Sequence, residues 1–460
     1  MLVMGLDSAV PLIVAEAAVL LRKILSLDKN PPIAEVLAAQ SLPRLRNLLG
    51  DSTRPSVQLE ACWCLTNIAS GSPDQTQAVV ECGAVPLFVQ LLLSNDPALQ
   101  EQAIWAMANI AGDRPEYRDG CISVGTVEAL SSILDSAIRT KSTQIARLGA
   151  WGLSNLCRGR PAPDLSKIAP ALPSLGRALS VSNDSEILAD TAWGLSYLTD
   201  SCNSDITNHI LKFFDLKRIV SLLGHPSSCV HTPILRVIGN LVSGQSDITL
   251  AVVSAGALSH LKSLAFVQKK SVRKEALWAI SNVSADSHAT LQSVIDCGLM
   301  GLICDIVRDG RSDSELRKEA IWTLCNAATV GNRDQIYTLV LKDRYKMAEV
   351  MCDFLETCRD PKTTRTVVDA IYAILCKGED EEDTDNPFTG IIEECGGLAI
   401  IEDLQEDESP EVYEGAIRVL ERFFDCEEVA QEQQPVARFD FSHPTGSKDG
   451  MPILPFARSG

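Results

Sequence analysis

One short helical motif recurs along the chain, and this repetition constrains the fold more than any other feature. Its copies read ACWCLTNIASG, AIWAMANIAGD, GAWGLSNLCRG, TAWGLSYLTDS, ALWAISNVSAD and AIWTLCNAATV. All six tryptophans lie in these copies. A seventh copy, ILRVIGNLVSG, has Arg236 at the tryptophan position, and with it successive copies are 42 to 46 residues apart. The aligned tryptophans are Trp63, Trp105, Trp151, Trp193, Trp278 and Trp322. A period of this length predicts a solenoid of stacked helical units.

Each unit has the same internal order, which is a glycine turn such as Cys82-Gly83-Ala84, an apolar helix, a polar break such as Ser94 to Pro97, and then the Trp helix. Weaker units flank the seven clear ones. The period is that of armadillo repeats. The predicted fold is therefore an all-α, right-handed superhelical armadillo solenoid of about ten three-helix repeats. It is expected to span residues 1–428 with an incomplete first repeat, and to be followed by a flexible, proline-containing tail at 429–460.

Composition agrees with helices and excludes several partners. Hydrophobic residues make up 46% of the chain but aromatic residues only 5%, which favours Leu/Ala-rich helices over a β-sandwich. The net charge of -19 repels nucleic acid and anionic membrane and attracts basic ligands. The 15 cysteines form no C-x-x-C pair, so a reducing cytoplasm or nucleus is expected. The apolar start of the chain is interrupted by Asp7 and Glu16, which indicates a core helix and not a signal or anchor.

The Trp helices carry a second recurring residue, an asparagine four positions after the tryptophan. Residues four apart share one face of a helix, so both side chains point toward the same partner. The asparagine amide can donate to and accept from the backbone of an extended peptide. Parallel indoles on successive repeats would form slots for the methylene stems of Lys or Arg, with cation-π attraction for the charged heads. The asparagines are Asn67, Asn109, Asn155, Asn240, Asn282 and Asn326.

Acidic residues lie on the same face. Asp113 follows Asn109 by one turn, and Glu60, Asp190, Glu275 and Glu319 each precede a motif tryptophan by three residues. These carboxylates are placed to meet ammonium and guanidinium groups. For an isolated tryptophan, burial in the core is the more common role, and for an isolated acid a solvated helix face is. The repetition in register favours a binding surface for the Trp/Asn pairs.

The quoted motifs resemble importin-α, the armadillo adaptor for nuclear localisation signals, from about Pro11 to Phe424. The most specific strings are CLTNIASGSPDQTQAVVECGAVPLFVQLL, RKEAIWTLCNAATVGN and EECGGLAIIEDLQEDESPEVYEGAI. The resemblance implies a nuclear import adaptor that binds lysine- and arginine-rich signals of cargo proteins at two sites. The implied major site, in repeats two to four, comprises Trp63, Asn67, Ser70, Gly71, Thr76, Gln102, Trp105, Asn109, Asp113, Trp151 and Asn155, with Asp190, Trp193 and Tyr197 beside it. The implied minor site, in repeats six to eight, comprises Arg236, Asn240, Glu275, Trp278, Ser281, Asn282, Glu319, Trp322 and Asn326.

Two departures from the family pattern carry expectations. Leu148 stands where the family usually has asparagine, which should remove one polar contact from the edge of the major site. The family begins with a basic segment that binds importin-β and folds back onto the groove, and this chain starts inside the first repeat. Importin-β is therefore expected to bind only if that segment is supplied. By the same resemblance, the C-terminal repeats meet an export receptor.

Other functions are disfavoured by the sequence. Armadillo scaffolds of the adhesion or signalling type are the alternative class, but they present basic grooves, which disagrees with the acidic ladder. No H-x-x-x-H pair, G-x-S-x-G motif or phosphate-binding loop occurs, so no enzymatic activity and no cofactor are expected. His225, Cys229 and His231 are irregularly spaced and predict a loop, not a metal site. The acidic run at 379–385 predicts a solvated loop.

Overall fold

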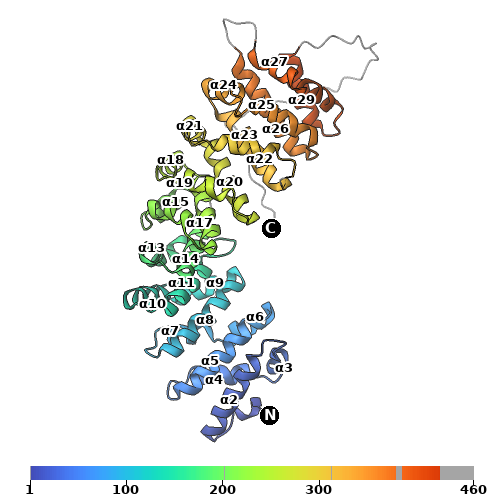
Figure 1. Cartoon of the computed structure of the whole chain (residues 1–460). Helices are drawn as coiled ribbons and strands as arrows, with labels where there is room; N and C mark the ends of the chain where they lie inside the picture. Colours follow the sequence, from blue (N-terminus) through green and yellow to red (C-terminus); the bar gives the residue numbers. More distant parts are fainter. Residues whose placement is uncertain (1, 201–202, 312, 380–385, 425–460) are drawn as a thin grey trace, which may run out of the picture.

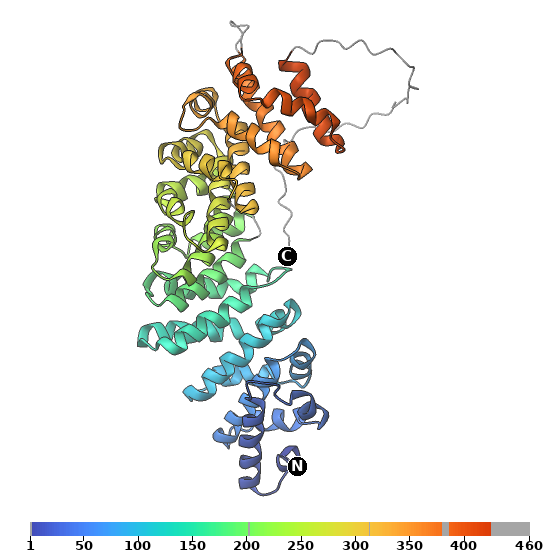
Figure 2. The same ribbon diagram turned by 45° about the vertical axis from the view of Figure 1, so that its right-hand side comes forward.

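The computed structural model describes residues 2–200, 203–311, 313–379 and 386–424, and within these ranges it contains helices and turns but no strand. The helices stack into an elongated superhelix, with the first repeat at one end and the last at the other (Figures 1 and 2). The described residues divide into ten helical repeats, of which the first has two helices and the others have three. The all-helical armadillo solenoid expected from the sequence is confirmed. The expected tail at 429–460 lies outside the described residues.

The repeats have the following bounds. The first contains α1 (Leu2–Gly5) and α2 (Pro11–Leu25), the second α3 (Ile33–Ala38), α4 (Leu42–Leu49) and α5 (Pro55–Ala69), and the third α6 (Pro73–Glu81), α7 (Val85–Leu92) and α8 (Pro97–Asp113). The fourth contains α9 (Pro115–Ser123), α10 (Thr126–Thr140) and α11 (Thr143–Cys157), and the fifth α12 (Leu165–Ile168), the 3-10 turn η1 (Ala169–Ala171), α13 (Leu172–Val181) and α14 (Ser185–Thr199). The sixth contains α15 (Ser204–Leu211), α16 (Leu216–Ser221), η2 (Leu222–Gly224) and α17 (Ser228–Leu241).

The remaining repeats follow the same order. The seventh contains α18 (Ser246–Ser254), α19 (Ala257–Leu264) and α20 (Lys270–Asp286), and the eighth α21 (His288–Asp296), α22 (Leu299–Arg308) and α23 (Ser314–Val330). The ninth contains α24 (Arg333–Leu341), α25 (Met347–Thr357) and α26 (Pro361–Gly378), and the tenth α27 (Pro387–Glu394), α28 (Gly397–Asp403), η3 (Leu404–Glu406) and α29 (Pro410–Phe423).

A left-handed residue joins the first and second helices of most repeats. In five repeats this residue is a glycine with a φ of 72° to 93°, namely Gly83, Gly125, Gly256, Gly298 and Gly396. Glycine adopts this conformation without the steric cost that a Cβ atom brings. Gln40 and Lys346 take the same place in the second and ninth repeats. In these seven repeats the turn therefore needs a left-handed residue, which glycine adopts most readily.

The third helix of most repeats begins at a strong start signal. Proline occupies the first position of α5, α8, α26 and α29, where its missing N–H has no partner to lose. Asp96, Asp184 and Asp313 cap α8, α14 and α23 by accepting hydrogen bonds from backbone N–H groups. In α5, α8, α14 and α23 these signals fix the start of a helix that carries a motif tryptophan.

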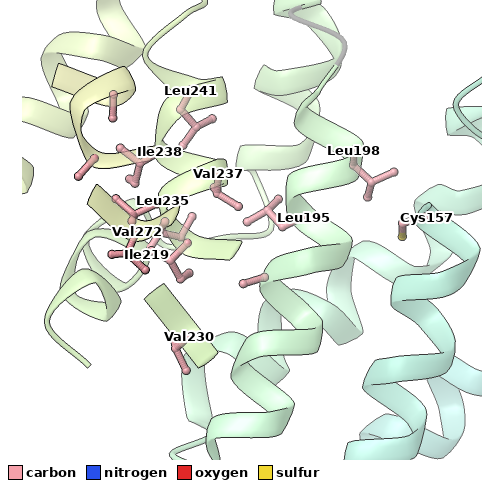
Figure 3. Packing of buried hydrophobic residues seen from close by; sticks show 14 of the residues in the cluster. Cys157, Leu195, Leu198, Ile219, Val230, Leu235, Val237, Ile238, Leu241 and Val272 are labelled. Carbon is pink, nitrogen blue, oxygen red and sulfur yellow. The ribbon is translucent and has the colours of Figure 1, made fainter. Parts of the chain in front are cut away.

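The third helices pack against one another in a row, and their inner faces build one continuous core. Figure 3 shows this packing where α14 meets α17, with Leu195 beside Val237 and Leu198 on the other side of α14, toward Cys157 of α11. Each repeat buries its apolar faces only against its neighbours, which is how a solenoid is stabilised. No single helix in the described ranges is long and apolar enough to cross a membrane, although two sharply bent helix pairs reach that length and composition together.

Candidate peptide-binding surface

The motif tryptophans occupy one equivalent position on the third helices α5, α8, α11, α14, α20 and α23. Because these helices lie side by side, the Trp and Asn side chains form a ladder along the solenoid. We use "the ladder" for the six tryptophans, the six asparagines four residues after them or after Arg236, and Tyr197 and Arg236 in the two interrupted rungs. Trp63 is 38% exposed and Trp105 is 40% exposed, and the other four are half-buried. None of the six tryptophans is a core residue.

The indoles of Trp105 and Trp151 contact each other directly. Their ring centroids are 4.8 Å apart and their planes are inclined by 56°. The expectation of parallel indoles with an open slot between them is therefore wrong for this pair. A methylene stem needs van der Waals distance to both rings, so a ligand side chain can enter here only if one indole changes its rotamer.

The ladder asparagines tie neighbouring repeats together. The side-chain nitrogen of Asn155 donates to the backbone oxygen of Ala108 at 3.1 Å, and that of Asn240 donates to Ser196 O at 2.9 Å. Asn282 and Asn326 make the same contact, to Gly239 O and Ser281 O. In every case the acceptor is the residue just before the ladder position of the preceding repeat. The amide oxygens of these four side chains accept no hydrogen bond from other described residues; Asn282 and Asn326 are half-buried, whereas Asn155 and Asn240 are buried.

The ladder already holds two guanidinium groups of its own. Arg22 on α2 lies over the indole of Trp63, with its Cζ 4.7 Å from the ring centroid, and its Nε donates to Glu60 at 2.5 Å. Arg236 on α17 repeats this arrangement, with its Cζ 5.9 Å from the Trp278 centroid and an Nη2 to Glu275 distance of 2.6 Å. In both cases the acid precedes its tryptophan by three residues. The Trp/acid combination is thus a guanidinium-binding unit.

Sequence reasoning missed Arg22 as a ladder residue. It precedes Trp63 by 41 residues, and four positions after it Ser26 accepts a hydrogen bond from the side chain of Asn67 at 2.8 Å. Arg22 and Ser26 therefore hold the Trp and Asn positions of the first repeat. Extending the period by one step toward the N-terminus would have found them.

Glu319 is the least compensated acid of the minor site. Its Oε2 atom is buried and has no hydrogen-bond partner among the described residues. Burial raises the pKa of this carboxyl to about 7, with Glu275 and Glu315 adding to the rise, while Lys274 and Lys318 oppose it. The ammonium of Lys318 lies over the Trp322 ring instead, 5.6 Å from its centroid. A ligand cation would relieve the desolvated carboxylate.

Asp190, in the fifth repeat, is also a partly buried acid with a raised pKa, but this pKa is lower than that of Glu319. Burial, followed by repulsion from Glu186, raises its pKa to about 6. Glu275 also has a raised pKa, because its burial outweighs the attraction of Arg236. The acids of the ladder are thus held partly out of water, and ionisation of Asp190 and Glu319 falls near neutral pH.

Asp113 lies at the last residue of α8 and pairs with Arg114 at 2.8 Å. The free carbonyl groups of a helix C-terminus carry partial negative charge, so this carboxylate adds to a field that favours cations. Ser70 and Gly71 are exposed just beyond the end of α5. Thr76, in contrast, is buried, and its hydroxyl donates to Ala69 O at 3.0 Å.

Two further predicted site residues are less accessible than the sequence suggested. Gln102 and Ser281 are buried, and the Ser281 hydroxyl accepts from Asn326 at 3.0 Å. Leu148 is also buried on α11, so it contributes to the packing of that helix. The ladder surface is therefore made mainly by the tryptophans, the amide groups and the acids.

The remaining sequence candidates are structural. His225, Cys229 and His231 make local hydrogen bonds at the start of α17. No group of three potential metal-ligating side chains converges in the described ranges. In the acidic run only Glu379 is described, and it pairs with Arg422 of α29 at 2.8 Å. Positions 380–385 lie outside the described residues.

Comparison with known proteins identifies the repeats and the relatives. Residues 29–70, 72–112 and 245–285 match the armadillo/β-catenin-like repeat, and residues 386–437 match the atypical Arm repeat. Importin subunit alpha-4 of Arabidopsis thaliana is 38% identical over 94% of this chain and 79% of its own length, and importin subunit alpha-1a of Oryza sativa is 38% identical over 90% and 77%. Importin subunit alpha-B of Dictyostelium discoideum is 37% identical over 97% of this chain and 86% of its own length.

A solved structure supports the same fold. The crystal structure of an engineered protein matches with a TM-score of 0.80 at 28% identity, over 91% of this chain and 97% of that one. The repeats, the ladder and the near-full-length identity to several relatives lead to one conclusion. The chain belongs to the importin-α family, whose members are nuclear import adaptors and not enzymes.

Proposed function

We propose that this protein binds lysine- and arginine-rich nuclear localisation signals of cargo proteins along the ladder. The major site lies in repeats two to four, around Trp63, Trp105, Trp151 and their asparagines. The minor site lies in repeats six to eight, around Trp278, Trp322 and their asparagines. Tyr197 and Arg236 interrupt the ladder between them, which suits a signal with two basic clusters joined by a linker.

The observation that carries the proposal is the pair of guanidinium groups that the ladder already holds. Arg22 and Arg236 each stack on a ladder indole and pair with the acid of the same rung, at 2.5 Å and 2.6 Å. A cargo arginine would find the same combination of ring face and carboxylate, and a lysine would use the same two groups. At the Trp105 rung the indole is 40% exposed and Gln102 stands in place of the acid, so a ligand side chain would use this ring once the contact with Trp151 opens.

The charge of the protein supports the same ligand class. With a net charge of -19, the protein attracts basic segments over distances of about a Debye length, roughly 8 Å at physiological ionic strength. Glu319 and Asp190 supply desolvated carboxylates within the ladder, where a cation gains more than it would at a fully hydrated surface. An adhesion-type scaffold for acidic partners does not fit these acids.

Wider assignments follow from the family and are proposals for this chain. They comprise shuttling between cytoplasm and nucleus, cooperation with importin-β through a basic segment supplied to the solenoid, and contact of an export receptor with the C-terminal repeats. We propose residues 1–428 as the binding solenoid and 429–460 as a separate tail. We propose neither nucleic acid nor membrane as a partner.

Titration of the purified protein with a lysine-rich signal peptide tests the proposal directly. Tryptophan fluorescence should change on binding, because the Trp105 and Trp151 indoles must separate to admit a side chain. A scrambled acidic peptide provides the ligand control. The variant Phe266→Ala, which removes an exposed aromatic side chain between α19 and α20, provides the protein control. Equal binding of both peptides would overturn the proposal.

A further inference from the structure

The N-terminal end of the solenoid exposes an apolar helix face. Every other third helix up to α26 packs between two equivalents, whereas α2 has only α5 on one side and the short α1 beside it. Figures 1 and 2 place α2 at the extremity of the superhelix. The side chains of Leu12, Ile13 and Leu20 on its outer face are 67%, 45% and 45% exposed. Terminal repeats of solenoids usually present a polar outer face.

The opposite end of the described solenoid follows the usual rule. After its first residue, Pro410, the exposed positions of α29 are charged except for one tyrosine, namely Glu411, Tyr413, Glu414, Arg418, Glu421 and Arg422. The apolar character of α2 is therefore a property of this end and not of terminal helices in general. Contiguous exposed apolar side chains indicate an interaction surface.

Apart from Pro11 at its start, the exposed residues of α2 form one narrow stripe. Successive residues of an α-helix are about 100° apart, so Leu12, Lys23, Glu16, Leu20 and Ile13 fall, in that order, within an arc of about 100°. Glu16 and Lys23 are exposed, and neither has an ion-pair partner among the described residues. The stripe therefore combines apolar side chains with one free acid and one free base.

This stripe is complementary to itself. When two copies of a helix pack antiparallel about a twofold axis, residue i of one copy faces residue j of the other with a constant sum of i and j. The sum that pairs Glu16 with Lys23 brings their charges together twice. The same register brings the two copies of Leu20 beside the axis and sets Leu12 at the C-terminal end of the partner's α2, just beyond which Leu27 is 53% exposed. One register thus satisfies the charges and the apolar residues together.

We propose that the protein forms an antiparallel homodimer through the outer face of α2. The interface lies at the small end of specific interfaces, because one helix stripe contributes most of it, so the dissociation constant should be micromolar. Arg22, which enters the ladder at Trp63, points away from the stripe on the same helix. Both ladders therefore stay accessible, and the dimer would present two signal-binding surfaces to cargo that carries two signals.

Sedimentation velocity of the full chain, from about 1 µM to about 100 µM, tests this proposal. The wild type should shift from monomer to dimer over this range. Leu20→Glu should raise the dissociation constant at least tenfold, whereas Leu93→Glu, which alters a leucine that is 69% exposed at the end of α7, should leave it unchanged. A wild-type protein that stays monomeric throughout, or an equal effect of both variants, would overturn the proposal.

Charge exchange tests the register independently of stability. Glu16→Lys alone and Lys23→Glu alone each place like charges opposite one another and should weaken dimerisation about fivefold or more. The double variant Glu16→Lys/Lys23→Glu restores both pairs and should return to within about twofold of the wild type. Both positions are exposed, so circular dichroism should be unaffected. Failure of the double variant to recover would refute the antiparallel arrangement.

Discussion

Binding of a basic peptide at the minor site should strengthen as the pH rises through neutrality. Glu319 must be ionised to attract a lysine or arginine, and its burial raises its pKa to about 7. Lysine and arginine side chains stay charged across this range, because their pKa values exceed about 10. Protonation of Glu319 therefore competes with the peptide, and a proton is released when the peptide binds.

The size of the effect follows from the pKa. If the bound peptide keeps Glu319 ionised, the apparent dissociation constant is multiplied by one plus the ratio of protonated to ionised carboxyl. With a pKa of about 7, this factor is about 11 at pH 6 and close to 1 at pH 8. Affinity should thus increase about tenfold over this range, which corresponds to about 1.4 kcal/mol.

Calorimetric titration in a background that carries Trp105→Ala and Asn109→Ala isolates the minor site for this measurement. Heats obtained in buffers of different ionisation enthalpy should report the released proton. Glu319→Gln should bind more weakly at pH 8 and should lose most of the pH dependence. A tenfold pH effect that persists in Glu319→Gln, or a flat profile in the background protein, would refute the role of this carboxyl.

Four further predictions follow from the structure. Asp113→Lys should weaken a lysine-rich peptide by about 2 to 5 kcal/mol, measured by fluorescence titration, because it places like charge at the end of α8; unchanged affinity would contradict this. Paired alanine substitution of Trp105 and Asn109 should weaken a peptide with one basic cluster more than the same change at Trp278 and Asn282, and equal losses would reverse the hierarchy. Arg22→Ala should expose the Trp63 indole and strengthen binding of a peptide extended by one lysine, with no gain for the unextended peptide in the same titration. Chemical denaturation should show that the free energy of unfolding of the wild type falls relative to that of Glu319→Gln as the pH rises from about 4.5 to about 7. The fall should reach up to about 3 kcal/mol, because the raised pKa of Glu319 stabilises the folded state only while the carboxyl is protonated.

The repeat fold could be predicted because its determinants are local and recur in register. A left-handed glycine such as Gly83 and a helix-start signal such as Pro97 act within one repeat, and the Trp helix that follows them has the same pattern in each repeat. The first repeat was harder to place. Its ladder positions hold Arg22 and Ser26, which share neither the indole nor the amide of the other rungs, so only the spacing reveals them.

The site could be predicted at the level of residues but not of their partners. The sequence placed Glu60 and Glu275 on the ligand-binding face, but it gave no sign that Arg22 and Arg236 of the preceding repeats reach them. Such contacts depend on the rise and rotation between repeats, which the period alone does not determine. The tilt between the Trp105 and Trp151 rings could not be predicted either, because it depends on two side-chain rotamers.

The recurrence of asparagine has two physical causes, and the structure separates them. An amide that bound only the ligand would make no contact with the neighbouring repeat. Asn240, however, lies in the rung interrupted by Arg236, is buried, and still donates to Ser196 O at 2.9 Å. This hydrogen bond joins the sixth repeat to the fifth, and without it the Ser196 carbonyl would lose a hydrogen-bond donor. The same donor at Asn155, Asn282 and Asn326 orients each side chain and leaves its oxygen unengaged by other described residues. The packing of one repeat on the next thus positions the acceptor that a peptide backbone would use.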